Sequence, residues 1–237
     1  MRADQLLVQR NLASTRSQAQ RLIADGVQWL KGAEWKTVTK NGDDIPLDLS
    51  PIQSFSPSEL ILLKTLLRKG INSPVTSSAG RLFDAVAALV GLRNCVSYEG
   101  QAALELEMAA TESPHPPYPF TLCPAADATI VDMKAMIATI VADLGAKILV
   151  KEISARFHAT LVAVVVEICS RVRAATGVNT IALSGGVFQN RLLTEGVIAA
   201  LQRKDFMVLT HSLVPPNDGG LSLGQAVVAA AQWQDRN

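Results

Sequence analysis

The sequence has little cysteine, few aromatic side chains and almost no net charge. Its 237 residues include three cysteines, 5% aromatic residues and 18% charged residues, with a formal net charge of +1. Because Cys95, Cys123 and Cys169 lie far apart and form no CxxC pair, the pattern excludes a disulfide framework and a zinc ribbon and is typical of a reducing compartment. The balanced charge excludes a protein that coats nucleic acid along its whole surface, so any basic surface must be local.

Long uninterrupted hydrophobic runs are also missing. The first ten residues, MRADQLLVQR, are polar and amphipathic and lack the apolar segment of a secretory signal. The most apolar stretch, which begins at Ala159, meets Glu167 and Arg171 too early to span a bilayer. We therefore expect a cytoplasmic protein with no membrane partner. The 49% hydrophobic content is enough for one large or two modest domains.

The composition changes near residue 50, which predicts two domains, residues 1–50 and 51–237. Basic residues outnumber acidic ones in the first forty, and the stretches NGDDIPLDLSP and SFSPSE that follow are typical of a connection. The first part predicts two short helices followed by a hairpin of VQWLKG and EWKTVTK. A small α+β module with a basic helix face favours structured RNA, although a solvated charged face is the alternative.

The run RADQLLVQRNLASTRSQAQRLIADGVQW resembles the alpha-L RNA-binding motif of the hemolysin-A-like (TlyA) ribosomal RNA methyltransferases, a motif that also occurs in pseudouridine synthases. The resemblance covers about the first fifty residues. It implies an RNA-facing surface made of Arg2, Arg16, Ser17, Gln20 and Arg21. The Gly-rich loop of a methyltransferase domain, which should follow in that family, does not appear.

The second part reads as helices alternating with short strands. The helices are expected at residues 56–70, 77–92, 98–110, 132–145, 151–177 and 187–205 and at the end of the chain, and the strands at 128–132, 179–186 and 206–211. Ser56 is expected to cap the first helix, and Ser77 or Ser78 the second. This alternation predicts an α/β domain with a partly parallel sheet.

Two glycine-bearing patterns favour a nucleotide site. Gly80 and Asp84 lie one helical turn apart, so a ribose could approach over the bare glycine while the carboxylate accepts hydrogen bonds from its hydroxyls. Gly185 and Gly186 follow an apolar strand, and a corner of this kind can hold phosphate against backbone N–H groups, with Asn190 near a purine or sugar. The alternatives are a packing glycine with a surface aspartate, and a plain turn.

A third pattern, PPNDGG, suggests a metal ligand. Two prolines stiffen a loop that presents Asp218 beside two glycines, and a carboxylate on such a loop is a candidate ligand for a divalent cation. The alternative is an Asx turn or a helix N-cap. The occurrence of all three patterns in one chain, in this order, favours the nucleotide interpretation.

Five ordered motifs closely resemble the C-terminal segment of the hydrogenase-maturation carbamoyltransferases (HypF). They are SSAGRLFDAVAALVGL, VSYEGQAALELE, ISARFHATL, LSGGVFQNRLL and VPPNDGGLSLGQA, and the resemblance runs from about residue 54 to about residue 233. It implies the second lobe of an actin-like, sugar-kinase-type ATP-binding fold. The family forms carbamoyl-adenylate from ATP and a carbamoyl group and passes the carbamoyl group to a C-terminal cysteine of a partner maturation protein, in the synthesis of the cyanide ligand of nickel-iron hydrogenases.

The resemblance implies a role for each site residue. Gly80 and Asp84 would bind ribose, Gly185 and Gly186 phosphate, Asn190 the adenosine, and Asp218 a divalent metal (iron, zinc or magnesium). The sequence assigns no catalytic residue. His115, His158 and His211 show no HxxxH spacing, so the metal site is expected to be incomplete, and His158, among apolar neighbours, is expected to be structural.

Three functional hypotheses remain at this point. The chain is a carbamoyltransferase segment that binds ATP, an RNA-binding protein acting through residues 1–50, or a non-functional fusion of two coding segments joined around residues 49–55. The missing first lobe further predicts an exposed apolar face and, through it, an oligomer.

Overall fold

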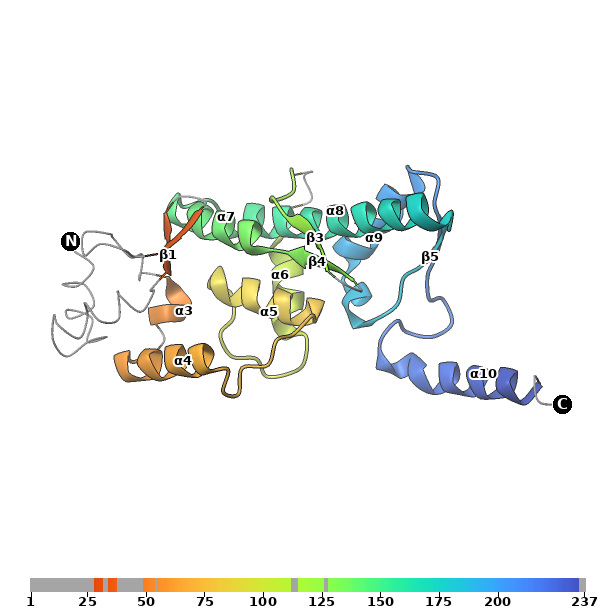
Figure 1. The fold of residues 1–237 in the computed structure, drawn as a ribbon, viewed down its shortest axis with the longest axis horizontal. Helices are drawn as coiled ribbons and strands as arrows, with labels where there is room; N and C mark the ends of the chain where they lie inside the picture. Colours follow the sequence, from red (N-terminus) through yellow and green to blue (C-terminus); the bar gives the residue numbers. More distant parts are fainter. Residues whose placement is uncertain are drawn as a thin grey trace. The chain divides into compact units, whose positions relative to one another are not determined.

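The structure is a computed structural model that describes residues 28–31, 34–37, 49–53, 55–111, 115–125 and 128–234 (Figure 1). The chain divides into two compact units. Unit 1 comprises Met1–Glu105 and Pro119–Val150, and unit 2 comprises Leu106–Tyr118 and Lys151–Asn237. The chain therefore passes between the units three times, after residues 105, 118 and 150.

Unit 1 contains two antiparallel strand pairs and several helices. The predicted hairpin is confirmed as strand β1 (Gln28–Lys31) paired with β2 (Glu34–Thr37). The second pair is β3 (Thr121–Pro124) with β4 (Thr129–Asp132). Of these two strands β3 was not predicted, because the Pro-rich sequence before it indicated a loop. The helices are α3 (Ser50–Gln53), α4 (Pro57–Lys69), α5 (Ala79–Leu89), most of α6 (Gln101–Ala109) and α7 (Lys134–Gly145).

Local sequence determines where the helices of unit 1 begin and end. Ser56 and Glu59 form a reciprocal capping box at the start of α4, and Gly70 ends that helix in the left-handed conformation with φ of 64°. At the start of α5 the Ser78 side chain accepts a hydrogen bond from the Arg81 N–H, which decides between the two serines that the sequence offered. The helix predicted from Ser56 to Gly70 is thus confirmed.

Unit 2 is built around one βαβ element. After helix α8 (Val150–Thr176) come strand β5 (Thr180–Ala182), the 3-10 turn η1 (Gly186–Gln189), helix α9 (Arg191–Gln202), strand β6 (Met207–Leu209), the turn η2 (Asp218–Gly220) and helix α10 (Leu221–Gln234). β5 and β6 pair in parallel. The expectation of one helix from residue 187 was wrong, because the chain makes a 3-10 turn first and α9 begins after Asn190.

The fold is a mixture of helices with small sheets. In the part of the chain that the structure describes, the six strands form three separate pairs, of which one is parallel. The expected α/β class with a partly parallel sheet is therefore only partly right. Because the strands are short, most of the buried residues belong to helices. The alternation of predicted helices and strands therefore did not indicate how small the sheets are.

Each unit has its own apolar core. The buried residues of unit 1 come mainly from α5 and α7 and include Phe83, Val86, Met136 and Ile140. Those of unit 2 come from α8, from α9 and from the residues next to β5 and β6, and they include Ile153, Phe157, Leu183, Val197, Leu201 and Phe206. Among the described helices α8 alone is long and apolar enough to cross a bilayer, but its buried side chains make it equally a core helix of unit 2.

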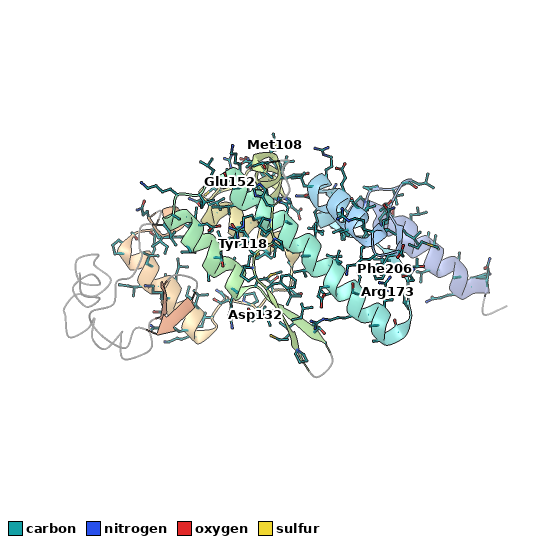
Figure 2. All side chains as sticks on the ribbon, turned by 90° about the horizontal axis from the view of Figure 1, so that it is seen from above. Met108, Tyr118, Asp132, Glu152, Arg173 and Phe206 are labelled. Atoms are coloured by element: carbon teal, nitrogen blue, oxygen red, sulfur yellow. The ribbon has the colours of Figure 1, made fainter. Side chains whose placement is uncertain are left out.

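Two further features of unit 2 concern its C-terminal half. The Arg173 guanidinium lies 3.9 Å from the ring centroid of Phe206 and ties the end of α8 to the residue before β6 (Figure 2). Helix α10 has no buried residue, and its exposed apolar side chains are Leu221, Leu223, Val227, Val228 and Trp233. That this helix forms the apolar face expected to meet a first lobe stays a prediction.

Candidate functional site

The glycine corner, Gly185 with Gly186, follows the end of β5. The Leu183 N–H donates to the Leu209 carbonyl at 2.9 Å, which extends the parallel pairing by one residue. Gly185 then turns with φ of 110° and ψ of 153°, a backbone conformation that essentially only glycine adopts. This explains why a glycine stands at this position: a side chain there would strain the backbone even though the space around it is open.

The loop that carries PPNDGG packs against this corner. The Gly185 N–H donates to the Pro216 carbonyl at 2.8 Å, and a Cβ placed on Gly186 would lie 3.8 Å from the Asn217 Cβ. Inside the loop, a Cβ on Gly220 would lie only 3.0 Å from the Pro215 carbonyl oxygen, so this glycine is required by close packing. Two motifs about thirty residues apart thus form one structure.

The corner leaves backbone donors available. Phe188 donates to the Gly185 carbonyl at 3.0 Å, whereas within the described part of the chain the N–H groups of Gly186 and Val187 have no protein acceptor. Both glycines of the corner are exposed. N–H groups without a protein acceptor at a turn of exposed glycines are suited to an anionic ligand such as phosphate.

The first turn of α9 is different, because the protein itself occupies it. The Asn190 Oδ1 accepts from the Leu193 N–H at 2.8 Å. The Glu107 Oε1, from α6, accepts from the N–H groups of Arg191 at 2.7 Å and Leu192 at 3.3 Å. A carboxylate therefore already satisfies the helix N-terminus, where it also interacts favourably with the helix dipole. A phosphate bound near this helix must lie at the corner instead.

A buried histidine supports Asn190 from α8. His158 is only 4% exposed, its Nδ1 lies 2.8 Å from the Ser154 carbonyl oxygen, and its Nε2 lies 2.9 Å from the Asn190 Nδ2. Burial lowers the pKa of His158, while the Ser154 carbonyl and the charge of Glu107 act in the opposite direction. The expectation that His158 is structural agrees with this burial. Asn190 is 8% exposed, so a contact between its amide and adenosine stays a prediction.

A second polar pair stands beside the corner. The His211 Nε2 lies 3.0 Å from the Ser184 Oγ, and both side chains are exposed. Each residue follows the carboxyl end of its strand by two positions, Ser184 after β5 and His211 after β6. Ligands of open α/β sheets bind at the carboxyl ends of parallel strands, so this pair lies where a bound phosphate could be contacted. The pair has no signal in the sequence, because only the pairing of β5 with β6 brings the two residues together.

Gly80 and Asp84 belong to unit 1, in the first turns of α5. Gly80 is exposed, and a Cβ placed on it would meet only the Ser78 Oγ, at 3.7 Å. Packing therefore does not require a glycine here. Asp84, half-buried, lies one turn further along the helix. The surface over Gly80 stays a predicted ribose site, separate in the chain from the corner of unit 2.

Asp218 does not stand within a set of metal ligands. It opens η2 as an exposed residue, and Asn217 caps this turn by accepting from the Gly219 N–H at 3.1 Å, which is the Asx arrangement that the sequence offered as the alternative. No group of three or more His, Cys, Asp or Glu side chains that could hold a metal occurs in the residues that the structure describes. Within the described residues Asp218 is thus a single carboxylate without further metal ligands, and its role as a metal ligand stays a prediction.

The five residues predicted to face RNA lie outside the described part of the chain: Arg2, Arg16, Ser17, Gln20 and Arg21. Their role stays a prediction.

Comparison with known proteins identifies the family. The family described as carbamoyltransferase, Kae1-like domain, second subdomain, matches residues 26–225. Carbamoyltransferase HypF of Synechocystis sp. is 37% identical over 174 residues, which cover 72% of this chain and 22% of that protein. HypF of Rhodobacter capsulatus is 34% identical over 227 residues, covering 88% of this chain and 28% of that protein.

A solved structure agrees with these relatives. The crystal structure of full-length HypF in the phosphate- and nucleotide-bound form is 40% identical, with a TM-score of 0.72, and the match covers 76% of this chain and 24% of that one. The chain thus spans about a quarter of the length of these relatives.

The family match changes the interpretation of the N-terminus. It begins at residue 26, ahead of the start near residue 54 that the motifs indicated and within the segment that resembles an RNA-binding module. These relatives give no support to the TlyA-like resemblance. The chain belongs to the HypF carbamoyltransferase family, to the second subdomain of its Kae1-like domain.

Proposed function

We propose that the chain supplies the nucleotide-binding part of a carbamoyltransferase of nickel-iron hydrogenase maturation. The observation that carries the proposal is the glycine corner, where Gly185 adopts φ of 110° and Gly186 and Val187 keep their N–H groups available beside the PPNDGG loop. A member of the family has been crystallised in a phosphate- and nucleotide-bound form, which supports ATP as the ligand.

In this proposal the corner binds phosphate oxygens of ATP through the backbone N–H groups of Gly186 and Val187. Ser184 and His211 are hydrogen-bonded to each other at 3.0 Å, and the pair donates to the same anion the one hydrogen that this bond does not use. Gly80 and Asp84 bind the ribose hydroxyls. ATP and carbamate then form carbamoyl-adenylate with release of diphosphate, and the carbamoyl group passes from the adenylate to the thiol of a cysteine of a partner maturation protein with release of AMP. We also propose that the chain forms one lobe of an actin-like fold and that the protein is cytoplasmic.

Isothermal titration calorimetry of the intact chain with ATP tests this function. We expect saturable binding that Gly186→Val weakens at least tenfold, because the new side chain meets Asn217 and covers the N–H groups. Gly224→Val is the matched control, since the same change at an open position of α10 should leave the affinity unaltered. Wild-type protein that gives no saturable heat, or equal affinity in the two variants, would refute the proposal.

Two further expectations of the sequence analysis remain proposals. RNA binding through residues 1–50 should be salt-dependent and should disappear when Arg16 and Arg21 are both replaced by Glu. Association through the exposed apolar side chains of α10 should appear in light scattering as a species larger than 25.3 kDa. A monodisperse monomer would contradict the second expectation.

A further inference from the structure

Three segments of unit 2 meet at a polar network, which consists of the buried residues His158, Asn190 and Ser154 together with the half-buried Glu107. The Ser154 Oγ donates to the Leu106 carbonyl of α6, and His158 joins Ser154 on α8 to Asn190 at the start of α9. Glu107 joins α6 directly to the first turn of α9. Ser154, His158 and Asn190 are all less than 10% exposed.

The chemistry of the partners fixes the orientation of the Asn190 amide and the tautomer of the His158 ring. The Leu193 N–H is a donor, so the Asn190 oxygen faces it and the Asn190 NH₂ group faces His158. The His158 Nε2 must therefore accept, and its Nδ1 carries the hydrogen that it donates to the Ser154 carbonyl. A ring protonated on both nitrogens would set two donors against each other. Only one neutral tautomer of His158 satisfies this arrangement.

The network ends next to the glycine corner. Asn190 closes η1 by donating its N–H to the Val187 carbonyl at 3.1 Å, and Val187 supplies one of the two available N–H groups of the corner. The Thr194 Oγ1 adds a second link, by donating to the Phe188 carbonyl at 2.8 Å. Asn190 thus closes the 3-10 turn whose first two residues, Gly186 and Val187, carry the available N–H groups.

We propose that His158 is a positioning residue of the nucleotide site, which acts through Asn190 to orient the N–H groups of Gly186 and Val187 toward the phosphate. This inference rests on the proposed function and adds a residue to it. Glu107 completes the arrangement, because its carboxylate occupies the first turn of α9 and leaves the corner as the place for an anion.

Three variants of the intact chain test this role, with ATP as the probe. His158→Leu removes the acceptor for Asn190 and should weaken ATP binding about tenfold, the loss expected when a buried donor is left unsatisfied. His158→Gln, whose amide oxygen can accept from the Asn190 NH₂ group, should restore the affinity to within about threefold of wild type.

The matched control is Thr160→Val, two residues along the same helix. The Thr160 Oγ1 is buried and accepts from the Tyr118 N–H at 2.7 Å, so its loss also removes a buried hydrogen bond, but one remote from Asn190. Thr160→Val should lower stability and leave ATP affinity unchanged. Equal ATP affinity in His158→Leu and Thr160→Val would overturn the proposal.

Hydrogen exchange without nucleotide separates this inference from the proposed function. In His158→Leu the Leu193 amide should exchange at least tenfold faster than in Thr160→Val, relative to the slowest amides of each protein. If wild-type protein binds no ATP, the proposed function fails, and equal exchange in the two variants would then also reject the positioning role. If His158→Leu does not fold, the ¹⁵N spectrum of the wild-type ring decides, because a hydrogen on Nε2 contradicts the network and a hydrogen on Nδ1 supports it.

Discussion

The first turns of α5, in unit 1, and of α9, in unit 2, both lie next to residues that the sequence predicts to bind nucleotide, yet they differ in which backbone and surface groups the protein leaves open. At α9 the N–H groups of Arg191, Leu192 and Leu193 all have acceptors from Glu107 and Asn190. At α5 the surface over Gly80 is exposed, and Ser78 is the single neighbour that a Cβ would meet. Helix N-termini are often anion sites, but at α9 the protein has closed that position with its own carboxylate.

The glycines of the two regions are present for different physical reasons. Gly185 is required by its backbone, since φ of 110° is strained for any side chain, whereas Gly80 has ordinary backbone and free space. A glycine that the fold does not require is better explained by a ligand that approaches closely. This difference predicts that substitution at Gly185 affects both fold and binding, and that substitution at Gly80 affects binding alone.

Gly185→Ala should have the largest effect. The strained backbone should lower the free energy of unfolding by about 1–3 kcal/mol, and the displaced corner should lose ATP affinity beyond detection. Urea denaturation and calorimetry measure the two effects. Unchanged stability would show that the corner relaxes at no cost and that glycine is not required there.

Gly196→Ala should lower the stability of the protein without lowering its affinity for ATP. A Cβ on Gly196 would lie 2.8 Å from the Val162 Cγ2, and valine in a helix has little rotamer freedom. Overpacking of α9 against α8 costs about 1–3 kcal/mol, partly offset by about 1 kcal/mol of helix propensity. Because Asn190 stays in place, ATP affinity should hardly change. A loss as large as that of Gly185→Ala would mean that binding follows stability alone.

Gly80→Ala should have the opposite profile. Alanine should stabilise α5 by about 0.5–1 kcal/mol, while its methyl group obstructs the ribose and weakens ATP binding several-fold. Gly145→Ala, at the open end of α7, is the control that gains helix propensity without touching the site. Full ATP affinity in Gly80→Ala would remove α5 from the proposed site.

Asp84→Ala should weaken ATP binding by about 0.5–1.5 kcal/mol, the worth of one hydrogen bond, without a change in stability beyond about 0.5 kcal/mol. Calorimetry with ATP and with 2′,3′-dideoxy-ATP distinguishes its role. The variant should lose most of the preference for ATP over the dideoxy nucleotide. If the preference persists, Asp84 does not contact the ribose hydroxyls.

Where local chemistry decides the structure, the sequence was sufficient. The cap at Ser56, the helix end at Gly70 and the hairpin of β1 with β2 follow from residues close to one another in the chain, and all three were predicted. The β3 strand was missed because Pro119 and Pro124 indicate a loop, although an edge strand tolerates proline at its end. The helix start at Arg191 was missed because Asn190 was interpreted as a ligand residue rather than as a cap.

The candidate site could be predicted only where a motif is contiguous. The glycine corner was found, but its contact with Pro216, the Ser184–His211 pair and the Glu107 carboxylate at α9 depend on segments that the fold brings together. His158 lay four residues after Ser154 on an apolar helix, which predicted its burial and not its partner. Single sequences contain no information on such long-range pairs beyond the side chains themselves.

The smallest expected effect is on the pH dependence of the free energy of unfolding, and it tests whether His158 is held neutral at the start of α9. Burial lowers the pKa of His158 below its ordinary value of about 6.5, whereas the unfolded chain takes up a proton near that value. The neutral His158 ring therefore contributes fully to the free energy of unfolding above about pH 6.5, and this contribution decreases as the pH falls towards the folded-state pKa. The Glu107 carboxylate favours the protonated ring, but burial has the larger effect. Urea denaturation between pH 7.5 and about pH 5 should show a steeper loss for wild type than for His158→Gln, because the amide does not titrate. Thr160→Val should be less stable at every pH with the wild-type slope; a slope that His158→Gln leaves unaltered would mean that His158 is not held neutral at the start of α9.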